Sequence, residues 1–114
     1  MLGHDELNWS RGGPQLRLAT RVGGELVGGC EIHVREAGLA TIAYWTFPSH
    51  RGRGYAKCAA RLLCEWAFEA LDLARIEAHV EEDNLASLAV ALGAGFEMTG
   101  RRDYRGRTVL ERRV

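Results

Sequence analysis

The stretch PSHRGRGYAKCAARLLCEW, residues 48–66, decides how this chain folds. An apolar segment runs into Pro48, and a loop with two glycines and two arginines follows it. After the loop, apolar residues recur at three- and four-residue spacing, which predicts an amphipathic helix over residues 54–71. Its predicted apolar stripe contains Cys58, Leu62, Trp66 and Ala70, with Ala59, Leu63 and Ala67.

The loop before this helix has the chemistry of an anion site. Gly52 and Gly54 carry no side chains, so a ligand can approach the backbone. The first helical turn leaves N–H groups without partners, and the helix dipole adds positive potential there. Arg51, Arg53 and Lys57 add charge. Together these features predict a phosphate or pyrophosphate site, and the alternative is a surface turn with solvated arginines.

The rest of the chain predicts an α+β fold with one sheet. Residues 1–15 read as a loose lead-in, and residues 16–114 as a single domain. Gly23-Gly24 is a hairpin turn signal, and Gly28-Gly29 marks a bulge in the strand that follows. The predicted strands occupy residues 16–22, 25–36, 39–47, 75–81, 96–101 and 107–113. The second helix is predicted over residues 85–92, between the fourth and fifth of these strands.

Composition narrows the function classes. The 114 residues carry a formal net charge of zero, so no basic field is available to hold nucleic acid or an anionic membrane. The start of the chain has no apolar leader segment, so we expect a cytoplasmic protein. The three cysteines predict buried free thiols rather than disulfides, and their spacing predicts no metal site.

Three segments together resemble one enzyme family. PSHRGRGYA resembles the acetyl-CoA pyrophosphate loop of the GNAT superfamily of N-acetyltransferases, at Arg51, Gly54 and Ala56. GLATIAYWTFP before it is similar to the family's fourth strand. RIEAHVEEDNLASLAVALGAGFEMTG is similar to its fifth strand and following helix, including the N-x-x-S element. The most similar subgroup acetylates N-termini of ribosomal proteins and small amines.

The resemblance covers residues 16–114 and implies a fold. It implies a GNAT-like mixed, mostly antiparallel sheet with two helices. Family domains normally begin with a strand and one or two helices that form much of the acceptor-binding wall, and the resemblance implies that this chain lacks them. Because an uncovered edge strand invites pairing with another chain, we expect a homodimer.

The resemblance also implies acetyl-CoA as co-substrate, without a metal. The pyrophosphate would lie on the loop backbone, at Arg51, Gly52, Arg53, Gly54, Tyr55 and Ala56. The pantetheine arm would lie along the backbone of Trp45, Thr46 and Phe47. Asn84 would contact CoA, or would serve only as a helix cap.

The family reaction is direct transfer, in which a neutral amine attacks the thioester carbonyl. Many members use a tyrosine on the last short helix to protonate the leaving thiolate, and Ala91 occupies that position here. Ser87, the serine of N-x-x-S, is the replacement candidate, and its alternative role is a small helix-packing residue.

The base that takes the amine proton is also left open by the sequence. Many relatives carry a glutamate in the fourth strand, where this chain has Thr41. Glu81 is our first candidate, because it ends the strand nearest Asn84 and Ser87. His79 is the second, and Glu77 and His33 are further candidates. A solvated strand face is the alternative for each.

The sequence therefore predicts an acetyl-CoA-dependent N-acetyltransferase. The acceptor would be a primary amine, either a small molecule or a peptide N-terminus. The rival hypothesis is a non-catalytic acyl-CoA-binding or regulatory module. Six arginines within residues 101–113 predict a solvated hairpin face, or else a contact with an acidic acceptor or a second subunit.

Overall fold

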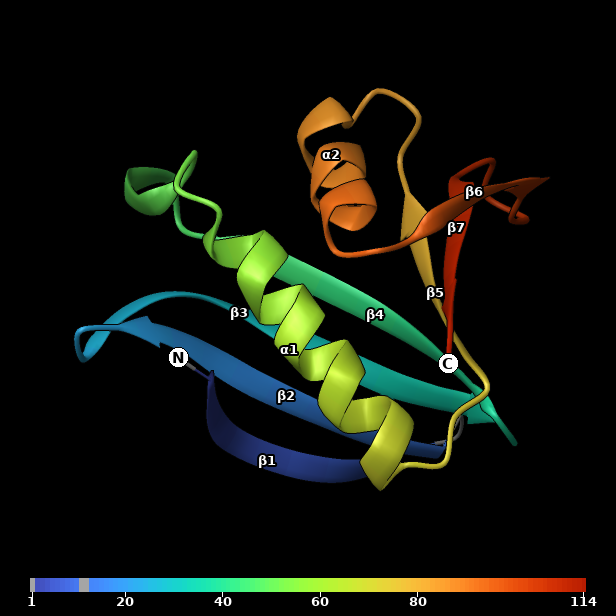
Figure 1. Cartoon of the computed structure of the whole chain (residues 1–114), viewed down its shortest axis with the longest axis horizontal. Coiled ribbons are helices and arrows are strands. Elements are labelled where there is room, and N and C mark those ends of the chain that lie inside the picture. The colour runs from blue at the N-terminus through green and yellow to red at the C-terminus, as the bar shows by residue number, and fades with distance from the viewer. Residues whose placement is uncertain (1, 11–12) are drawn as a thin grey trace.

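The computed structural model describes the backbone of residues 2–10 and 13–114 and the side chains of residues 15–114. In this part of the chain seven strands form one sheet in the order β1-β2-β3-β4-β5-β7-β6 (Figure 1). The β4–β5 ladder is parallel and the others are antiparallel. This confirms the predicted α+β class with two α-helices. The elements are β1 (Leu2–Ser10), β2 (Gly13–Val22), β3 (Glu25–Glu36), β4 (Leu39–Thr46), a 3-10 helix (Pro48–His50), α1 (Tyr55–Ala70), β5 (Arg75–Val80), α2 (Leu85–Gly93), β6 (Glu97–Arg102) and β7 (Thr108–Arg113).

The start of the chain differs from the prediction. Residues 2–10 were expected to be a loose lead-in, but they form β1, which pairs with β2 along its length. Their mostly polar composition gives no strand signal. The partner that completes their backbone hydrogen bonds lies on β2, which no local pattern reveals. In the described residues no α-helix precedes α1.

Helix α1 lies across β3 and β4, and it turns a different face to them than the sequence predicted (Figure 1). Leu62 and Trp66 expose 42% and 46% of their surface. The stripe prediction was wrong for Leu62, Trp66 and Ala70, which are exposed, and right for the buried Ala59, Leu63 and Ala67. Alanines and leucines occur around most of the helix, so the sheet selects the face that packs. Small side chains on that face let the helix approach the strands closely. The buried residues of α1 are Ala59, Ala60, Leu63, Cys64 and Ala67.

Two glycines of β3 make room for a tryptophan of β4. A Cβ atom on Gly29 would lie 2.5 Å from Cζ2 of Trp45, and one on Gly28 would lie 2.2 Å from the Trp45 carbonyl oxygen. Only glycine allows this approach. The β2–β3 register also shifts between Thr20 and Arg21, opposite this pair, which confirms the predicted bulge.

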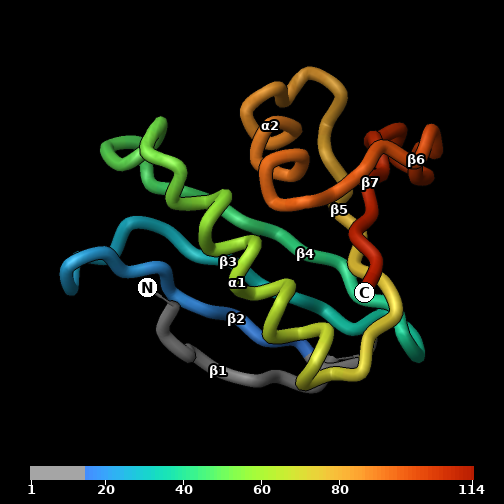
Figure 2. The backbone as a smooth tube through the Cα atoms, in the orientation of Figure 1, coloured from blue at the N-terminus to red at the C-terminus, as the bar shows by residue number. Residues whose placement is uncertain are grey.

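Strands β4 and β5 pair over only half of their length. Their parallel ladder joins Leu39–Ile42 to Arg75–Ala78, and no pairing continues beyond Ile42 and Ala78. The two strands then separate toward α2 and the start of α1 (Figure 1). The tube view shows the loop before α1 and helix α2 at this same end of the molecule (Figure 2). The fold thus places a gap in the sheet between the two motifs that the sequence singled out.

The cysteines are free, as predicted. Cys30 and Cys64 are buried, and burial raises the pKa of each thiol to about 12, so neither is a nucleophile near neutral pH. None of the helices in the described part of the chain has the length and apolarity that a membrane crossing requires.

Candidate active site

The glycine–arginine loop presents bare backbone to a cavity. Gly54 is the N-cap of α1 with φ of 77°, and Gly52 has φ of 81°. No heavy atom lies within 4 Å of the place where a Cβ atom would stand on either residue. The positive φ and the open space together explain both glycines. They border a cavity of about 540 Å³, which we call the loop pocket.

Most of the predicted cofactor residues line the loop pocket. Those that do are Trp45, Thr46, Arg51, Gly52, Gly54, Tyr55, Ala56 and Asn84. Phe47 and Arg53 are not among its lining residues. Lys57 also lines the pocket, so it adds a second cationic residue to the lining besides Arg51.

The backbone of β4 faces the gap at alternate residues. The Phe47 amide donates a 2.8 Å hydrogen bond to the Val27 carbonyl on β3. Because amide directions alternate along a strand, the main-chain groups of Tyr44 and Thr46 face the β5 side, where β5 has moved away. The Thr46 carbonyl accepts a 3.2 Å hydrogen bond from Arg51 Nε. Of the three predicted β4 positions, Thr46 is therefore the one whose main chain faces the gap.

Asn84 is the N-cap of α2, which is one of the two roles predicted for it; the other is a contact with CoA. Its Oδ1 accepts a 3.0 Å hydrogen bond from the Ser87 amide. This bond holds the first turn of α2 beside the open end of β4.

Tyr44 and Ser87 join β4 to α2 across the gap. The Tyr44 hydroxyl donates a 2.8 Å hydrogen bond to the Ser87 carbonyl, and Ser87 Oγ donates a 3.2 Å hydrogen bond to the Tyr44 hydroxyl. Burial raises the pKa of Tyr44 against the opposing effect of the Ser87 hydrogen bond, so the phenol stays protonated near neutral pH. Nothing local in the sequence distinguishes Tyr44 from a core aromatic residue, so the sequence does not predict its place in the site.

A small cavity of about 140 Å³ fills the gap itself, and we call it the gap pocket. Its walls come from the separating ends of β4 and β5 and from the first turn of α2. They are Ile42, Ala43, Tyr44, Ala78, His79, Val80 and Ser87.

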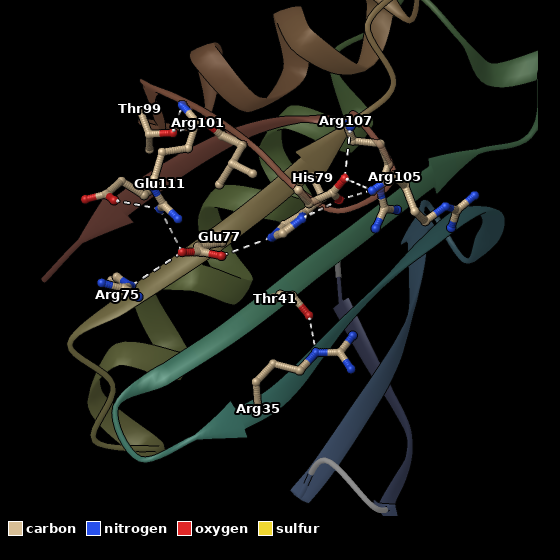
Figure 3. Close-up of polar contacts among 12 residues, drawn as sticks. Arg35, Thr41, Arg75, Glu77, His79, Thr99, Arg101, Arg105, Arg107 and Glu111 are labelled. Carbon is tan, nitrogen blue, oxygen red and sulfur yellow. Dashed lines mark hydrogen bonds and ion pairs between the residues drawn. The ribbon is translucent and has the colours of Figure 1, made fainter.

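A larger polar cavity lies on the sheet face opposite α1. Ile32 on β3 points into the core beneath α1, so its neighbours Glu31 and His33 point to the other face. There they line a cavity of about 510 Å³, which we call the polar pocket. Thr41 and Arg35 also line it, and Thr41 Oγ1 accepts a 2.9 Å hydrogen bond from Arg35 Nε (Figure 3).

The polar pocket contains a charged network around His79 (Figure 3). His79 Nδ1 lies 2.8 Å from Asp103 Oδ2, and Nε2 lies 3.0 Å from Glu77 Oε1. Arg107 Nε donates a 2.7 Å hydrogen bond to Asp103, and Arg101 donates a 3.0 Å hydrogen bond to Glu77. Positive and negative groups thus alternate from the β6–β7 loop to β5.

Both carboxylates of the network are held ionised. Burial by itself would raise the pKa of Glu77, but hydrogen bonds from His79 and Arg101 outweigh it and lower that pKa. Desolvation likewise opposes ionisation of Asp103, and hydrogen bonds from His79 and Arg107 outweigh it, so its pKa is also lowered. Since an ionised carboxylate only accepts, His79 satisfies both contacts when both ring nitrogens carry hydrogen. His79 can accept a proton only in its neutral form, in which one ring nitrogen carries no hydrogen and cannot donate to its carboxylate.

The other base candidates occupy different positions. Glu81 follows the end of β5, its side chain is 56% exposed, and it lies 4.0 Å from Arg105. It lines none of the three pockets. Glu77 and His33 both line the polar pocket. Burial, followed by the nearby charge of Arg35, lowers the pKa of His33, so this imidazole is neutral at pH 7.

The arginines of the last hairpin have partners within the chain. Four of them form ion pairs with carboxylates of β5, of the β5–α2 loop or of the β6–β7 loop: Arg101, Arg102, Arg105 and Arg107. Arg113 pairs with Glu111. Arg112 donates to the Ala94 carbonyl over 3.1 Å and lies over the Phe68 ring. The intramolecular contacts therefore account for all six side chains.

The three pockets share walls, and the gap pocket adjoins both of the others. Tyr44 and Ser87 line both the loop pocket and the gap pocket. Ile42, Ala43 and His79 line both the gap pocket and the polar pocket. The gap pocket therefore lies between the loop pocket and the polar pocket, where β4 and β5 separate. Within the described residues no group of three or more His, Cys, Asp or Glu side chains is placed to hold a metal ion.

Comparison with known proteins agrees with this geometry. Residues 5–97 match the family model described as an acetyltransferase (GNAT) domain. The chain is 36% identical over 83 residues to the uncharacterized N-acetyltransferase p20 of Bacillus licheniformis, covering 70% of this chain and 47% of that protein. It is 43% identical over 61 residues to the probable N-acetyltransferase YjcK of Bacillus subtilis, covering 54% of this chain and 34% of that protein. The chain thus spans about half the length or less of these two relatives.

A solved structure shows the same fold. RimJ of Mycobacterium smegmatis, in complex with CoA-disulfide, superposes with a TM-score of 0.79 at 29% identity, over 88% of this chain and 53% of RimJ. The family match covers most of the residues that build the three pockets, including the loop, β4, β5 and α2. This protein belongs to the GNAT acetyltransferase family.

Proposed function

We propose that this protein transfers the acetyl group of acetyl-CoA to a primary amine by direct transfer. The observation that carries the proposal is the arrangement of the three pockets. The gap pocket lies between the loop pocket and the polar pocket and shares lining residues with each. Direct transfer needs both substrates bound at once, with the reacting atoms meeting at one point. The gap is the place where two ligands bound on opposite faces of this sheet could meet.

The donor end fits the loop pocket. The first amides of α1 and the side chains of Arg51 and Lys57 supply the positive potential that a pyrophosphate requires. Gly52 and Gly54 leave the backbone open for its approach. The main-chain groups of Thr46 and Tyr44 face the gap, where an extended pantetheine arm could bond to them as an added strand would.

The acceptor end fits the polar pocket. The ionised Glu77 and Asp103 can accept hydrogen bonds from the N–H groups of an amine at the mouth of the gap. His79 lies at the junction with the gap, so we favour it over the exposed Glu81 as the group that takes the amine proton. It does so from its neutral form, through the ring nitrogen that carries no hydrogen. A small amine or the N-terminus of a peptide is small enough to enter a cavity of about 510 Å³.

The test is release of free thiol from acetyl-CoA across a panel of small amines and peptides. Turnover with at least one amine is the expected result. CoA should also raise the thermal unfolding midpoint, because a ligand at about 100 times its dissociation constant stabilises the native state by about 2.7 kcal/mol. A response to ATP without a response to CoA would contradict the donor assignment.

The same experiment distinguishes acetyl transfer from the rival hypothesis, a non-catalytic acyl-CoA-binding or regulatory module. Tight CoA binding without turnover on any amine would favour a non-catalytic acyl-CoA-binding module. The observation behind this rival is that the chain spans only 47% of the length of p20. The homodimer also remains a proposal, with β1 and β6 as the open sheet edges, and sedimentation would test it.

A further inference from the structure

The structure assigns to Tyr44 the role of proton donor to the leaving sulfur, a role that rests on the proposed acetyl transfer. Tyr44 comes from β4, while the sequence pointed to Ser87 on α2 for this step. The assignment depends on where the two hydroxyl groups lie, how they are bonded to each other, and which of them can give up a proton.

Position is the first step. Tyr44 and Ser87 are the residues that line both the loop pocket and the gap pocket. The sulfur stays with the donor on the loop side, and the acyl carbon faces the gap. Hydroxyl groups at this junction are therefore placed on the sulfur side of the bond that breaks. His79, at the other end of the gap, is placed on the amine side.

The hydrogen bonds distinguish the two hydroxyls. Ser87 Oγ donates its hydrogen to the Tyr44 hydroxyl over 3.2 Å, and the Tyr44 hydroxyl donates its own to the Ser87 carbonyl over 2.8 Å. The Ser87 hydroxyl hydrogen is thus engaged by the phenol oxygen. The phenol hydrogen can rotate from the Ser87 carbonyl to a ligand in the gap. Ser87 then remains behind it as a hydrogen-bond donor to the phenol oxygen.

The chemistry favours the phenol as well. A phenol has an ordinary pKa near 10, several units below that of an aliphatic hydroxyl, so its proton transfers at a lower cost. Burial keeps Tyr44 protonated at neutral pH. The side chain is partly buried, so water competes weakly for the proton.

The step balances as follows. The amine nitrogen forms a bond to the thioester carbon, and the carbon–sulfur bond breaks with its electron pair going to sulfur. The Tyr44 O–H bond breaks and its proton goes to sulfur, which leaves as a thiol. The amine enters this step neutral, after a protonated amine has released a proton to solvent, and its nitrogen then loses one proton to the neutral imidazole of His79. The phenolate is stabilised by the Ser87 hydrogen bond and regains a proton from solvent, while His79 releases one.

A binding cycle tests the contact without turnover. CoA and desulfo-CoA, which lacks the sulfur, are titrated by calorimetry into the parent protein and Tyr44→Phe. A hydrogen bond from the phenol to sulfur should make the parent prefer CoA by roughly 2- to 10-fold, and Tyr44→Phe should bind both ligands equally. A preference that survives in Tyr44→Phe overturns the proposal. So does an equal loss of affinity for both ligands.

Kinetics test the proton transfer. Tyr44→Phe should lower kcat with acetyl-CoA by roughly 10²-fold or more, with little change in KM. The loss should shrink with an S-acetyl ester of an acidic aromatic thiol, because that thiolate leaves without a proton. An equal loss with both donors would show that Tyr44 only supports the structure. Thr20→Val, which removes a buried hydroxyl on β2 outside all three pockets, is the matched control and should keep full activity.

Ser87→Ala separates the two hydroxyls. Tyr44 bonds to the Ser87 main-chain carbonyl, so this bond survives in Ser87→Ala and the loss in kcat should be smaller than in Tyr44→Phe. The reverse order would return the role to Ser87 and overturn the proposal. A parent that turns over no amine would count against acetyl transfer itself, and the CoA binding cycle would still decide whether the Tyr44 hydroxyl meets the sulfur.

Discussion

Ile42 on β4 and Ala78 on β5 are the last facing pair of the parallel ladder, and the two strands separate beyond them. Both residues are buried, so the separation begins inside the core and not at a frayed end. The three pockets meet at this point, because Ile42 lines the polar pocket and the gap pocket while Ala78 lines the gap pocket. The predictions below concern the two sides of this gap and the core that supports it.

Gly54→Ala should weaken CoA binding without unfolding the protein. The new methyl group would stand where the pyrophosphate approaches the backbone, at a residue with φ of 77°. A residue with a Cβ atom in this left-handed region costs roughly 1–2 kcal/mol, so strain alone must be controlled for. Gly106→Ala is the control, because Gly106 has φ of 81°, open space around it, and a place outside the loop pocket. Equal CoA affinity in the two variants, measured by calorimetry, would show that the loop is only a surface turn.

His79→Gln should lower turnover by roughly 10²–10⁴, the usual effect of losing general acid–base help. His79 lies where the polar pocket meets the gap, whereas Glu81 is exposed and lines none of the three pockets. Glu81→Gln should therefore reduce the steady-state rate much less than His79→Gln. CoA affinity should stay nearly constant in both variants, because neither side chain lines the loop pocket. A larger effect of Glu81→Gln would restore Glu81 as the leading base.

Acid should destabilise the protein through Glu77 and Asp103. The pKa of each is lower in the folded protein than its ordinary value, which is 4.5 for Glu77 and 3.8 for Asp103. A lowered folded pKa contributes stability that is fully present above the ordinary pKa and is lost as the pH falls through the folded pKa. The free energy of unfolding should therefore fall as the pH drops from about 5 toward 2.

Urea unfolding at a series of pH values measures this effect. Asp103→Asn and Glu77→Gln should each be less stable than the parent at pH 7 and should lose less stability on acidification. A parallel acid dependence in the parent and both variants would mean that the His79 network does not contribute to stability.

Thr20→Val should stabilise the protein. Thr20 is 2% exposed, and its Oγ1 has no hydrogen-bond partner in the part of the chain whose side chains are described. Removing a buried hydroxyl without a partner should raise the free energy of unfolding by about 1 kcal/mol. Thr99→Val is the control and should lower the free energy of unfolding. Thr99 Oγ1 donates a 2.7 Å hydrogen bond to the Val109 carbonyl and accepts a 3.0 Å hydrogen bond from the Arg101 amide. Destabilisation by Thr20→Val in denaturant titrations would contradict this account.

The donor end of the site could be predicted from the sequence because its parts are contiguous. Gly52, Gly54 and the start of α1 follow one another, and each has a local reason for its place. Asn84 and Ser87 are likewise neighbours in one helical turn. Local backbone preference and helix-end chemistry act over a few residues, so a single sequence carries them.

The acceptor end and the proton donor depend on tertiary structure. Asp103 meets His79 across 24 positions and Tyr44 meets Ser87 across 43, so no local pattern connects either pair. The register of β5 with β7 and the separation of β4 from β5 create these contacts. The strand at residues 2–10 and the buried face of α1 likewise depend on partners elsewhere in the chain. The sequence by itself thus determined the elements from residue 16 onward, the anion loop and the family resemblance, because these rest on local chemistry. Only the folded sheet decided which distant side chains share the gap, since strand order and register bring them together.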